Sequence, residues 1–119
     1  MSNLRVGSIV WGVSDVARAT AFWTAALDYV PREPGDETWV VLVPRSGEGP
    51  GLSLALSESP VAEHPRVHLD LYTADQAGEV ERLVGLGAHR VDWDRYPPNA
   101  DFVVLADPDG NIFCVIDKG

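Results

Sequence analysis

The stretch that decides the fold is His68-Leu69-Asp70-Leu71-Tyr72-Thr73-Ala74-Asp75, because a strand-like alternation of side chains runs directly into an acidic helix cap. Side chains of a strand alternate between two faces, so His68, Asp70 and Tyr72 share one face and the two leucines share the other. The leucine face predicts burial in a core. The polar face predicts the lining of a site.

A second stretch of the same design begins 60 positions earlier, Ser8-Ile9-Val10-Trp11-Gly12-Val13-Ser14-Asp15. Later in each half, the apolar runs at residues 39–43 and 102–106 also match. Neither half has enough apolar surface to stand alone, so the two must pack together. The repeat predicts an α+β fold of two tandem βαβββ modules that form a curled mixed sheet with helices outside.

The predicted boundaries divide one domain, residues 1–119, into module one at about 1–58, a proline-containing linker at about 59–65, and module two at about 66–119. Helical spacing of apolar residues follows the N-cap candidates Asp15 and Asp75, and Gly87 is a suitable helix stop. Strand patterns occur at 6–13, 38–43, 52–57, 66–72, 88–93, 102–106 and 112–116.

Composition limits the classes of partner. The chain has 119 residues and a formal net charge of -9, which opposes binding to a nucleic-acid backbone or an anionic membrane surface. Its single cysteine excludes an internal disulfide. No secretory signal or run of 18 apolar residues is present, so we expect a cytoplasmic protein with a small neutral or cationic ligand, no nucleic acid and no membrane.

Three sets of motifs, in order along the chain, carry a family resemblance. They are Val13-Ser14-Asp15 with Phe22-Trp23, His68-Leu69-Asp70-Leu71 with Leu86-Gly87-Ala88, and Ala106-Asp107-Pro108-Asp109-Gly110-Asn111 with Phe113-Cys114. Together they resemble the vicinal oxygen chelate superfamily and, more narrowly, its small glyoxalase-like proteins. That superfamily includes glyoxalases, extradiol dioxygenases, and fosfomycin and bleomycin resistance proteins. The resemblance covers almost the whole chain.

The resemblance also implies where a divalent metal would be held. Its enzymes use His or Glu side chains from four strands, and the corresponding positions here are Ser8, Ala55, His68 and Cys114. Only His68 is a typical ligand, whereas a catalytic metal needs about three protein ligands. We therefore predict no catalytic metal and no other cofactor.

Two candidates for chemistry have structural alternatives. His68 and Asp70 on one strand face suit general acid/base work, or they form a polar network with each other or with Ser8. Cys114 is a thiolate ligand or nucleophile, or it is a small buried hydrophobe among apolar neighbours.

Four tryptophans raise the question of an aromatic pocket. Trp23 lies on the core-facing side of a predicted helix. Trp11 lies on the strand face opposite Ser8, the face that is expected to pack against the helices. Trp39 and Trp93 lie on strands, where they suit an aromatic or cationic ligand or simple core packing. The predicted ligand-binding residues are Ser8, Trp39, His68, Asp70, Tyr72, Trp93 and Cys114.

These features favour a small-molecule binding protein of the glyoxalase/bleomycin-resistance type without a catalytic metal. One alternative is a metal-independent lyase or isomerase that uses His68 and Asp70 as catalytic residues. A second is a metal-dependent glyoxalase or dioxygenase. The resemblance further implies a homodimer, which would cover the apolar runs at 39–43 and 102–106 if these are edge strands.

Overall fold

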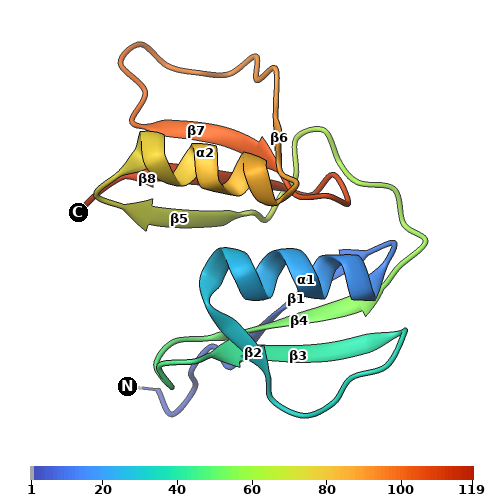
Figure 1. The fold of residues 1–119 in the computed structure, drawn as a ribbon. Coiled ribbons are helices and arrows are strands. Elements are labelled where there is room, and N and C mark those ends of the chain that lie inside the picture. Colours follow the sequence, from blue (N-terminus) through green and yellow to red (C-terminus); the bar gives the residue numbers. More distant parts are fainter. Residues whose placement is uncertain (1) are drawn as a thin grey trace. The chain divides into compact units, whose positions relative to one another are not determined.

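A computed structural model describes residues 2–119 and shows two compact units, one up to Ser59 and one from Pro60 onward (Figure 1). Each unit has the element order βαβββ, with a four-stranded mixed sheet and one helix. The predicted α+β class with two βαβββ modules is therefore confirmed. Of the residues expected to form a linker, about 59–65, Ser59 ends the first unit and 60–65 fall inside the second.

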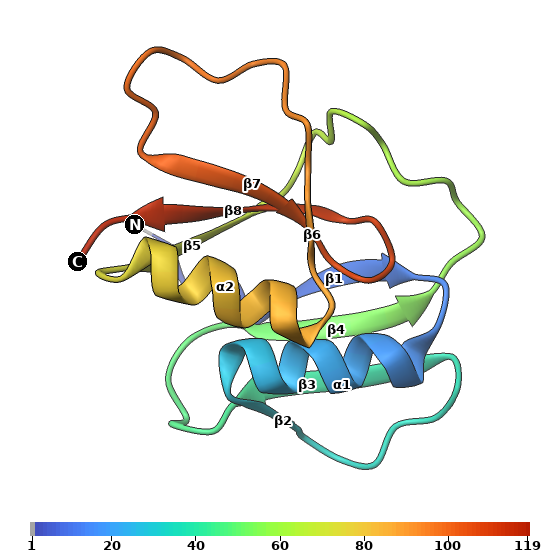
Figure 2. The same ribbon diagram turned by 45° about the horizontal axis from the view of Figure 1, so that its top comes forward.

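The first unit consists of β1 (Ser8–Val13), α1 (Val16–Leu27), β2 (Tyr29–Pro31), β3 (Trp39–Pro44) and β4 (Gly51–Leu56). Its sheet has the order β1-β4-β3-β2. The first and last strands, β1 and β4, pair in parallel, and the other pairs are antiparallel. One face of this sheet is covered by α1 (Figure 2).

The second unit repeats the arrangement with β5 (Leu69–Thr73), α2 (Gln76–Leu86), β6 (His89–Arg90), β7 (Phe102–Ala106) and β8 (Ile112–Asp117). Its sheet has the order β5-β8-β7-β6, again with the first and last strands in parallel. The last strand of each unit is thus an inner strand of its sheet. In the second unit this places β8, and with it Cys114, between β5 and β7.

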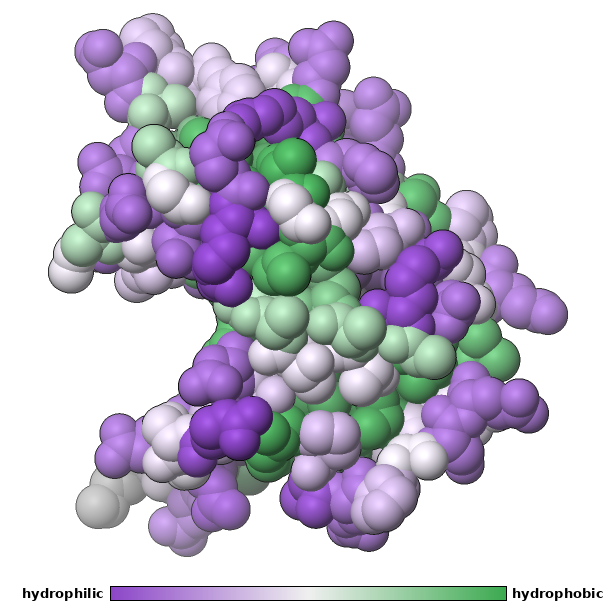
Figure 3. All heavy atoms as spheres, in the orientation of Figure 1, coloured by the Kyte–Doolittle hydropathy of each residue, from purple (hydrophilic) through white to green (hydrophobic). Residues whose placement is uncertain are grey.

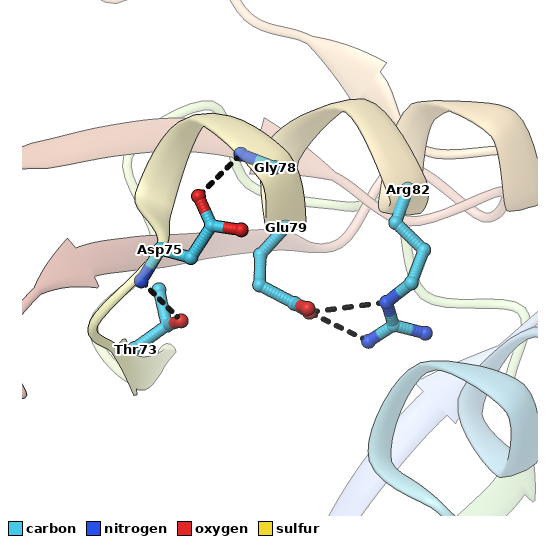
Figure 4. A network of polar contacts seen from close by, with 5 residues as sticks. All are labelled: Thr73, Asp75, Gly78, Glu79 and Arg82. Atoms are coloured by element: carbon cyan, nitrogen blue, oxygen red, sulfur yellow. Dashed lines mark hydrogen bonds and ion pairs between the residues drawn. The ribbon is translucent and has the colours of Figure 1, made fainter.

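Both helices begin where the sequence predicts, because an aspartate side chain caps each of them. Asp15 accepts a hydrogen bond from Arg18 N at 3.0 Å, and Asp75 accepts one from Gly78 N at 3.1 Å. Figure 4 shows the α2 cap, where Thr73 Oγ1 also accepts from Asp75 N at 3.0 Å. A Cβ atom at residue 78 would overlap the Asp75 carboxylate, so glycine keeps this cap compact. The caps fix the point at which β1 and β5 each turn into a helix.

The core of the first unit lies between α1 and its sheet. Trp23 is fully buried, and its ring meets Trp11 and Phe22 edge to face, with centroid distances of 6.2 and 4.9 Å. Trp11 is buried, as its parity in the strand predicts. These two tryptophans therefore belong to the core and not to a ligand site.

The structure differs from the sequence pattern at three strands. β2 was not predicted, because three residues ending in Pro31 carry no alternation; it is an edge strand, where proline is tolerated. The strand predicted at 88–93 is reduced to His89–Arg90, and the one predicted at 66–72 begins only at Leu69.

The assignment of 39–43 and 102–106 to sheet edges is wrong. The strands that contain them, β3 and β7, are each paired on both sides, and the edges are β1 and β2 in one sheet and β5 and β6 in the other. The argument that a partner covers these apolar strands therefore no longer supports the homodimer. The homodimer stays a prediction.

The surface in the view of Figure 3 is largely hydrophilic, with smaller hydrophobic areas between the charged side chains. Within residues 2–119, neither α1 nor α2 is long and apolar enough to cross a membrane.

Candidate functional site

His68, Asp70 and Cys114 lie together in the second unit. Asp70 in β5 pairs with Cys114 in the adjacent parallel strand β8, and His68 precedes β5 on the face of Asp70. The nitrogen, oxygen and sulfur atoms that these residues offer lie within 4.8 Å of one another. The parallel register of β5 and β8 thus creates a cluster of three chemically active side chains, which we call the polar cluster.

The His68–Asp70 pair is the accessible part of the polar cluster. His68 Nε2 lies 2.9 Å from Asp70 Oδ1, and the two side chains are 41% and 47% exposed. This distance makes an ion pair when the imidazole is protonated. Because both groups remain half exposed, a ligand can reach them without a change in the fold.

Cys114 forms the buried end of the polar cluster. Burial raises the pKa of its thiol to about 11, and the negative charge of Asp70 adds to this effect. The thiol is therefore protonated at neutral pH and is a poor nucleophile. Of the two interpretations that the sequence left open, this environment favours the small buried hydrophobe.

An apolar cluster adjoins Cys114 on the same face of the sheet. Its buried members are Val104, Ala106, Ile112 and Cys114, and Val91, Trp93, Phe102 and Ile116 pack against it while remaining partly exposed. The face therefore combines a half-exposed polar pair with partly exposed aromatic rings.

Two further side chains, His64 and Asp94, hold the Trp93 side chain in place. The His64 ring lies 5.1 Å from the Trp93 ring, and its Nε2 donates a hydrogen bond to Asp94 Oδ1 at 2.9 Å. This hydrogen bond holds the pKa of Asp94 below its usual value. This contact could not be predicted from sequence patterns, because His64 lies in an aperiodic, proline-containing stretch 30 residues from its partner.

Tyr96 also fixes the segment between β6 and β7. Its hydroxyl oxygen accepts a hydrogen bond from Val104 N at 2.7 Å, and its ring lies 5.2 Å from that of Phe102. The segment that follows Trp93 is thereby tied to the chain's own sheet.

The other predicted ligand-binding residues are placed as follows. Tyr72 is 62% exposed, and Lys118 Nζ lies 5.3 Å from its ring centroid. Trp39, which is 43% exposed, and Ser8 belong to the first unit. The Ser8 and Ser53 hydroxyl groups lie 2.6 Å apart and hydrogen-bond to each other. The structure thus joins His68, Asp70, Cys114 and Trp93 within one unit.

The strand register identifies the counterpart of Cys114 in the first unit. Cys114 pairs with Asp70, and the equivalent pair in the first unit is Ser53 with Val10. Ala55, the position expected from the resemblance, pairs with Gly12 instead. The first unit therefore offers two serine hydroxyls where the second has an imidazole and a thiol.

The residues present do not fit a hard divalent metal such as Mn²⁺, which prefers carboxylate, carbonyl and water ligands. The polar cluster supplies one carboxylate, one imidazole in contact with it, and a thiol that must first lose its proton. Ser8 and Ser53 are neutral and engage each other.

We expect Mn²⁺, Ni²⁺ and Zn²⁺ at sub-millimolar concentration to shift the melting temperature by less than about 1 °C, since a weakly bound ion adds little to RT ln(1 + [L]/Kd). Thermal melts with and without each ion check this. A rise of several degrees that disappears in Cys114→Ser would contradict it and establish the polar cluster as a metal site.

A cavity of about 630 Å³ lies elsewhere, in the first unit, and none of the polar cluster lines it. The cavity thus lies in the first unit, whereas the chemically active side chains lie in the second. The candidate site is the polar cluster, because its reactive groups share Cys114 with an apolar cluster that carries partly exposed aromatic rings.

Comparison with known proteins identifies the family. A model of the glyoxalase-like domain matches residues 8–116. No curated protein matches the sequence. Among solved structures, a glyoxalase-related enzyme from Fulvimarina pelagi is similar, with 20% identity, a TM-score of 0.70, and coverage of 94% of this chain and 86% of that one.

Two further solved structures are similar in fold. A member of the glyoxalase/bleomycin resistance protein/dioxygenase superfamily from Sphaerobacter thermophilus has 23% identity and a TM-score of 0.67, and 95% of this chain and 96% of that one are covered. A mutant of the fosfomycin resistance protein FosX from Listeria monocytogenes, complexed with Mn(II) and 1S,2S-dihydroxypropylphosphonic acid, has 15% identity and a TM-score of 0.74, with 100% and 93% covered.

The family match extends over both βαβββ units, and the structural matches cover nearly the whole chain. The chain therefore belongs to the glyoxalase-like domain family.

Proposed function

We propose that this protein binds a small aromatic or cationic molecule at the polar cluster and at the aromatic side chains of Trp93 and Phe102, without a catalytic metal. One observation carries the proposal: the half-exposed His68–Asp70 pair lies beside Cys114, and partly exposed aromatic rings pack against the apolar cluster that contains Cys114. Ligand sites commonly combine apolar walls with a few convergent polar groups.

The chemistry of the residues indicates the class of ligand. Asp70 provides an exposed carboxylate, which attracts a cation or accepts a hydrogen bond from a ligand. Trp93 and Phe102 offer aromatic surface for stacking or for a cation over the ring. The net charge of -9 opposes anionic ligands at long range.

Family membership supports a small-molecule ligand in general terms. The FosX structure holds Mn(II) and a phosphonic acid, but its likeness to this chain is at the level of fold. The polar cluster supplies a single carboxylate as a hard ligand, so we propose no such metal complex for this protein.

Proton transfer is a second candidate function, favoured by the 2.9 Å contact between His68 Nε2 and Asp70 Oδ1. A carboxylate in contact with one ring nitrogen orients an imidazole for proton transfer. His68 would then move a proton on a bound ligand, as a metal-independent lyase or isomerase requires.

Calorimetric titration with a panel of aromatic amines, amidines and catechols tests the binding function. We expect Asp70→Asn to weaken binding of a cationic hit by about tenfold or more, because a charge-assisted contact is lost. His68→Ala is expected to weaken binding less, while abolishing any turnover in which His68 moves the proton.

Matched variants in the same unit control for effects on the fold. His89→Ala removes an exposed imidazole from β6, and Asp101→Asn neutralises an exposed carboxylate just before β7. Both should bind like the unmodified protein. If no compound of the panel bound, the proposal would be refuted. Equal losses of affinity in Asp70→Asn and Asp101→Asn would also refute it.

A further inference from the structure

The 630 Å³ cavity in the first unit lies where the start of α1 faces the loop between β2 and β3. Its walls are largely apolar and include Val16, Ala17, Val40, Leu56 and Pro34. A volume of about 300–1,000 Å³ is typical of small-molecule pockets. Every lining residue belongs to the first unit, so this cavity is a different site from the polar cluster.

The loop wall of the cavity is held in place by the sheet. A Cβ atom at Gly35 would lie 2.6 Å from Val40 Cβ and 2.7 Å from Trp39 O, so only glycine lets the loop backbone lie this close to β3. Asp36 Oδ1 accepts hydrogen bonds from Thr38 N at 2.8 Å and from Trp39 N at 3.1 Å. The wall is therefore formed before any ligand binds.

The charged side chains that line the cavity are all acidic. Asp15, Asp36 and Glu37 line the cavity, and none of its lining residues in the described part of the chain is basic. Hydrogen bonds from Thr38 hold the pKa of Asp36 below its usual value, so this carboxylate is ionised at neutral pH. Two cations flank the lining: Arg18, whose guanidinium donates a hydrogen bond to Ser14 Oγ at 3.1 Å, and Arg32, whose Nε lies 3.6 Å from Glu33 Oε1.

We infer that this cavity is a second binding site, which takes a small organic cation with an apolar body. The apolar part would pack against Val16, Val40 and Leu56, and the cationic group would lie near Asp15 and Glu37. The three lining carboxylates outnumber the two flanking guanidinium groups, of which that of Arg32 is paired with Glu33, and the charge of the whole protein adds to the attraction. An anion of the same size would be repelled.

Benzyltrimethylammonium is a suitable probe, with phenylacetate as an anion and N-benzylacetamide as a neutral compound of similar size. We expect saturable changes in the amide ¹H–¹⁵N resonances of Ala17, Gly35 and Glu37 with the cation, and weaker or no changes with the other two. Equal changes with all three compounds, or cation-induced changes confined to residues 60–119, would overturn the inference.

Variants that keep the fold test the roles of charge and volume. Asp15→Asn retains a good N-cap, so the double variant with Glu37→Gln removes two charges without unravelling α1. We expect about tenfold weaker binding of the cation in this variant. Ala17→Leu keeps a strong helix former and fills the cavity, so it should abolish binding.

Two controls separate this site from other acidic surface and from the polar cluster. Glu48→Gln, in the turn between β3 and β4, removes an exposed carboxylate outside the cavity and should leave cation binding unchanged. Asp70→Asn should also leave it unchanged, although the same variant weakens binding at the polar cluster. Unaltered affinity in the double variant would refute the inference, even if Ala17→Leu failed to fold.

Discussion

Trp23→Ala is expected to lower the free energy of unfolding by about 3–5 kcal/mol, the usual cost of removing a fully buried large aromatic side chain. Trp23 has no solvent exposure and contacts Trp11 and Phe22 edge to face. The variant therefore loses buried area and leaves a void under α1. Because whole proteins are stable by only about 5–15 kcal/mol, a loss of this size threatens the first unit.

Urea unfolding followed by circular dichroism at 222 nm measures this change without relying on tryptophan fluorescence. Trp39→Ala is the matched control, since that side chain is 43% exposed and its removal should cost much less. Similar losses in the free energy of unfolding of the two variants would contradict the expected contribution of Trp23 to the core.

The second large effect concerns the reactivity of Cys114. A rise in the thiol pKa from 9.0 to about 11 reduces the thiolate fraction at pH 8 by roughly 100-fold, and the thiolate is the reacting species. Burial of the side chain slows a bulky reagent further. We expect dithionitrobenzoate to react with the native protein at least about 100 times more slowly than with the unfolded chain.

The chain has one cysteine, so the absorbance change reports Cys114 alone. Asp70→Asn should speed the reaction, because the nearby negative charge contributes to the raised pKa. A native rate close to that in guanidinium chloride would contradict this account.

The same shift affects stability in alkali. Between about pH 9 and pH 11 the unfolded chain loses the thiol proton while the native state keeps it, so Cys114 makes stability fall as pH rises through this window. Below pH 9 the thiol is protonated in both states, and the contribution is fully present.

Most of the fold could be predicted from the sequence, because alternation and capping are local signals. Asp15 and Asp75 begin the two helices as expected, and the strand 102–106 has the predicted bounds. β2 was missed because its pairing with β3 depends on a tertiary neighbour and not on its own pattern. The order of strands was misjudged for a similar reason, since hydrophobicity does not tell an inner strand from an edge.

The candidate site was only partly predictable. Period-2 geometry correctly placed His68 and Asp70 on one face, and their contact at 2.9 Å follows from it. The proximity of Cys114 to His68 was expected from the family resemblance, which gave both as metal-ligand positions, and it depends on β8 lying in parallel beside β5. His64 and Asp94 were missed because their contact joins two irregular segments, where no periodicity exists.

The inner position of β4 and β8 has a consequence for synthesis on the ribosome. In each unit the first strand finds its partner only across a long separation, Ser8 with Gly51 and Leu69 with Phe113. Closing so long a loop is slow compared with pairing of neighbouring strands. Until the fourth strand emerges, β1 or β5 has no hydrogen-bonding neighbour in its sheet, and the nascent unit exposes apolar strand surface that a chaperone could bind. Translation of the last strand, and not of the helix, is thus the event that completes each unit.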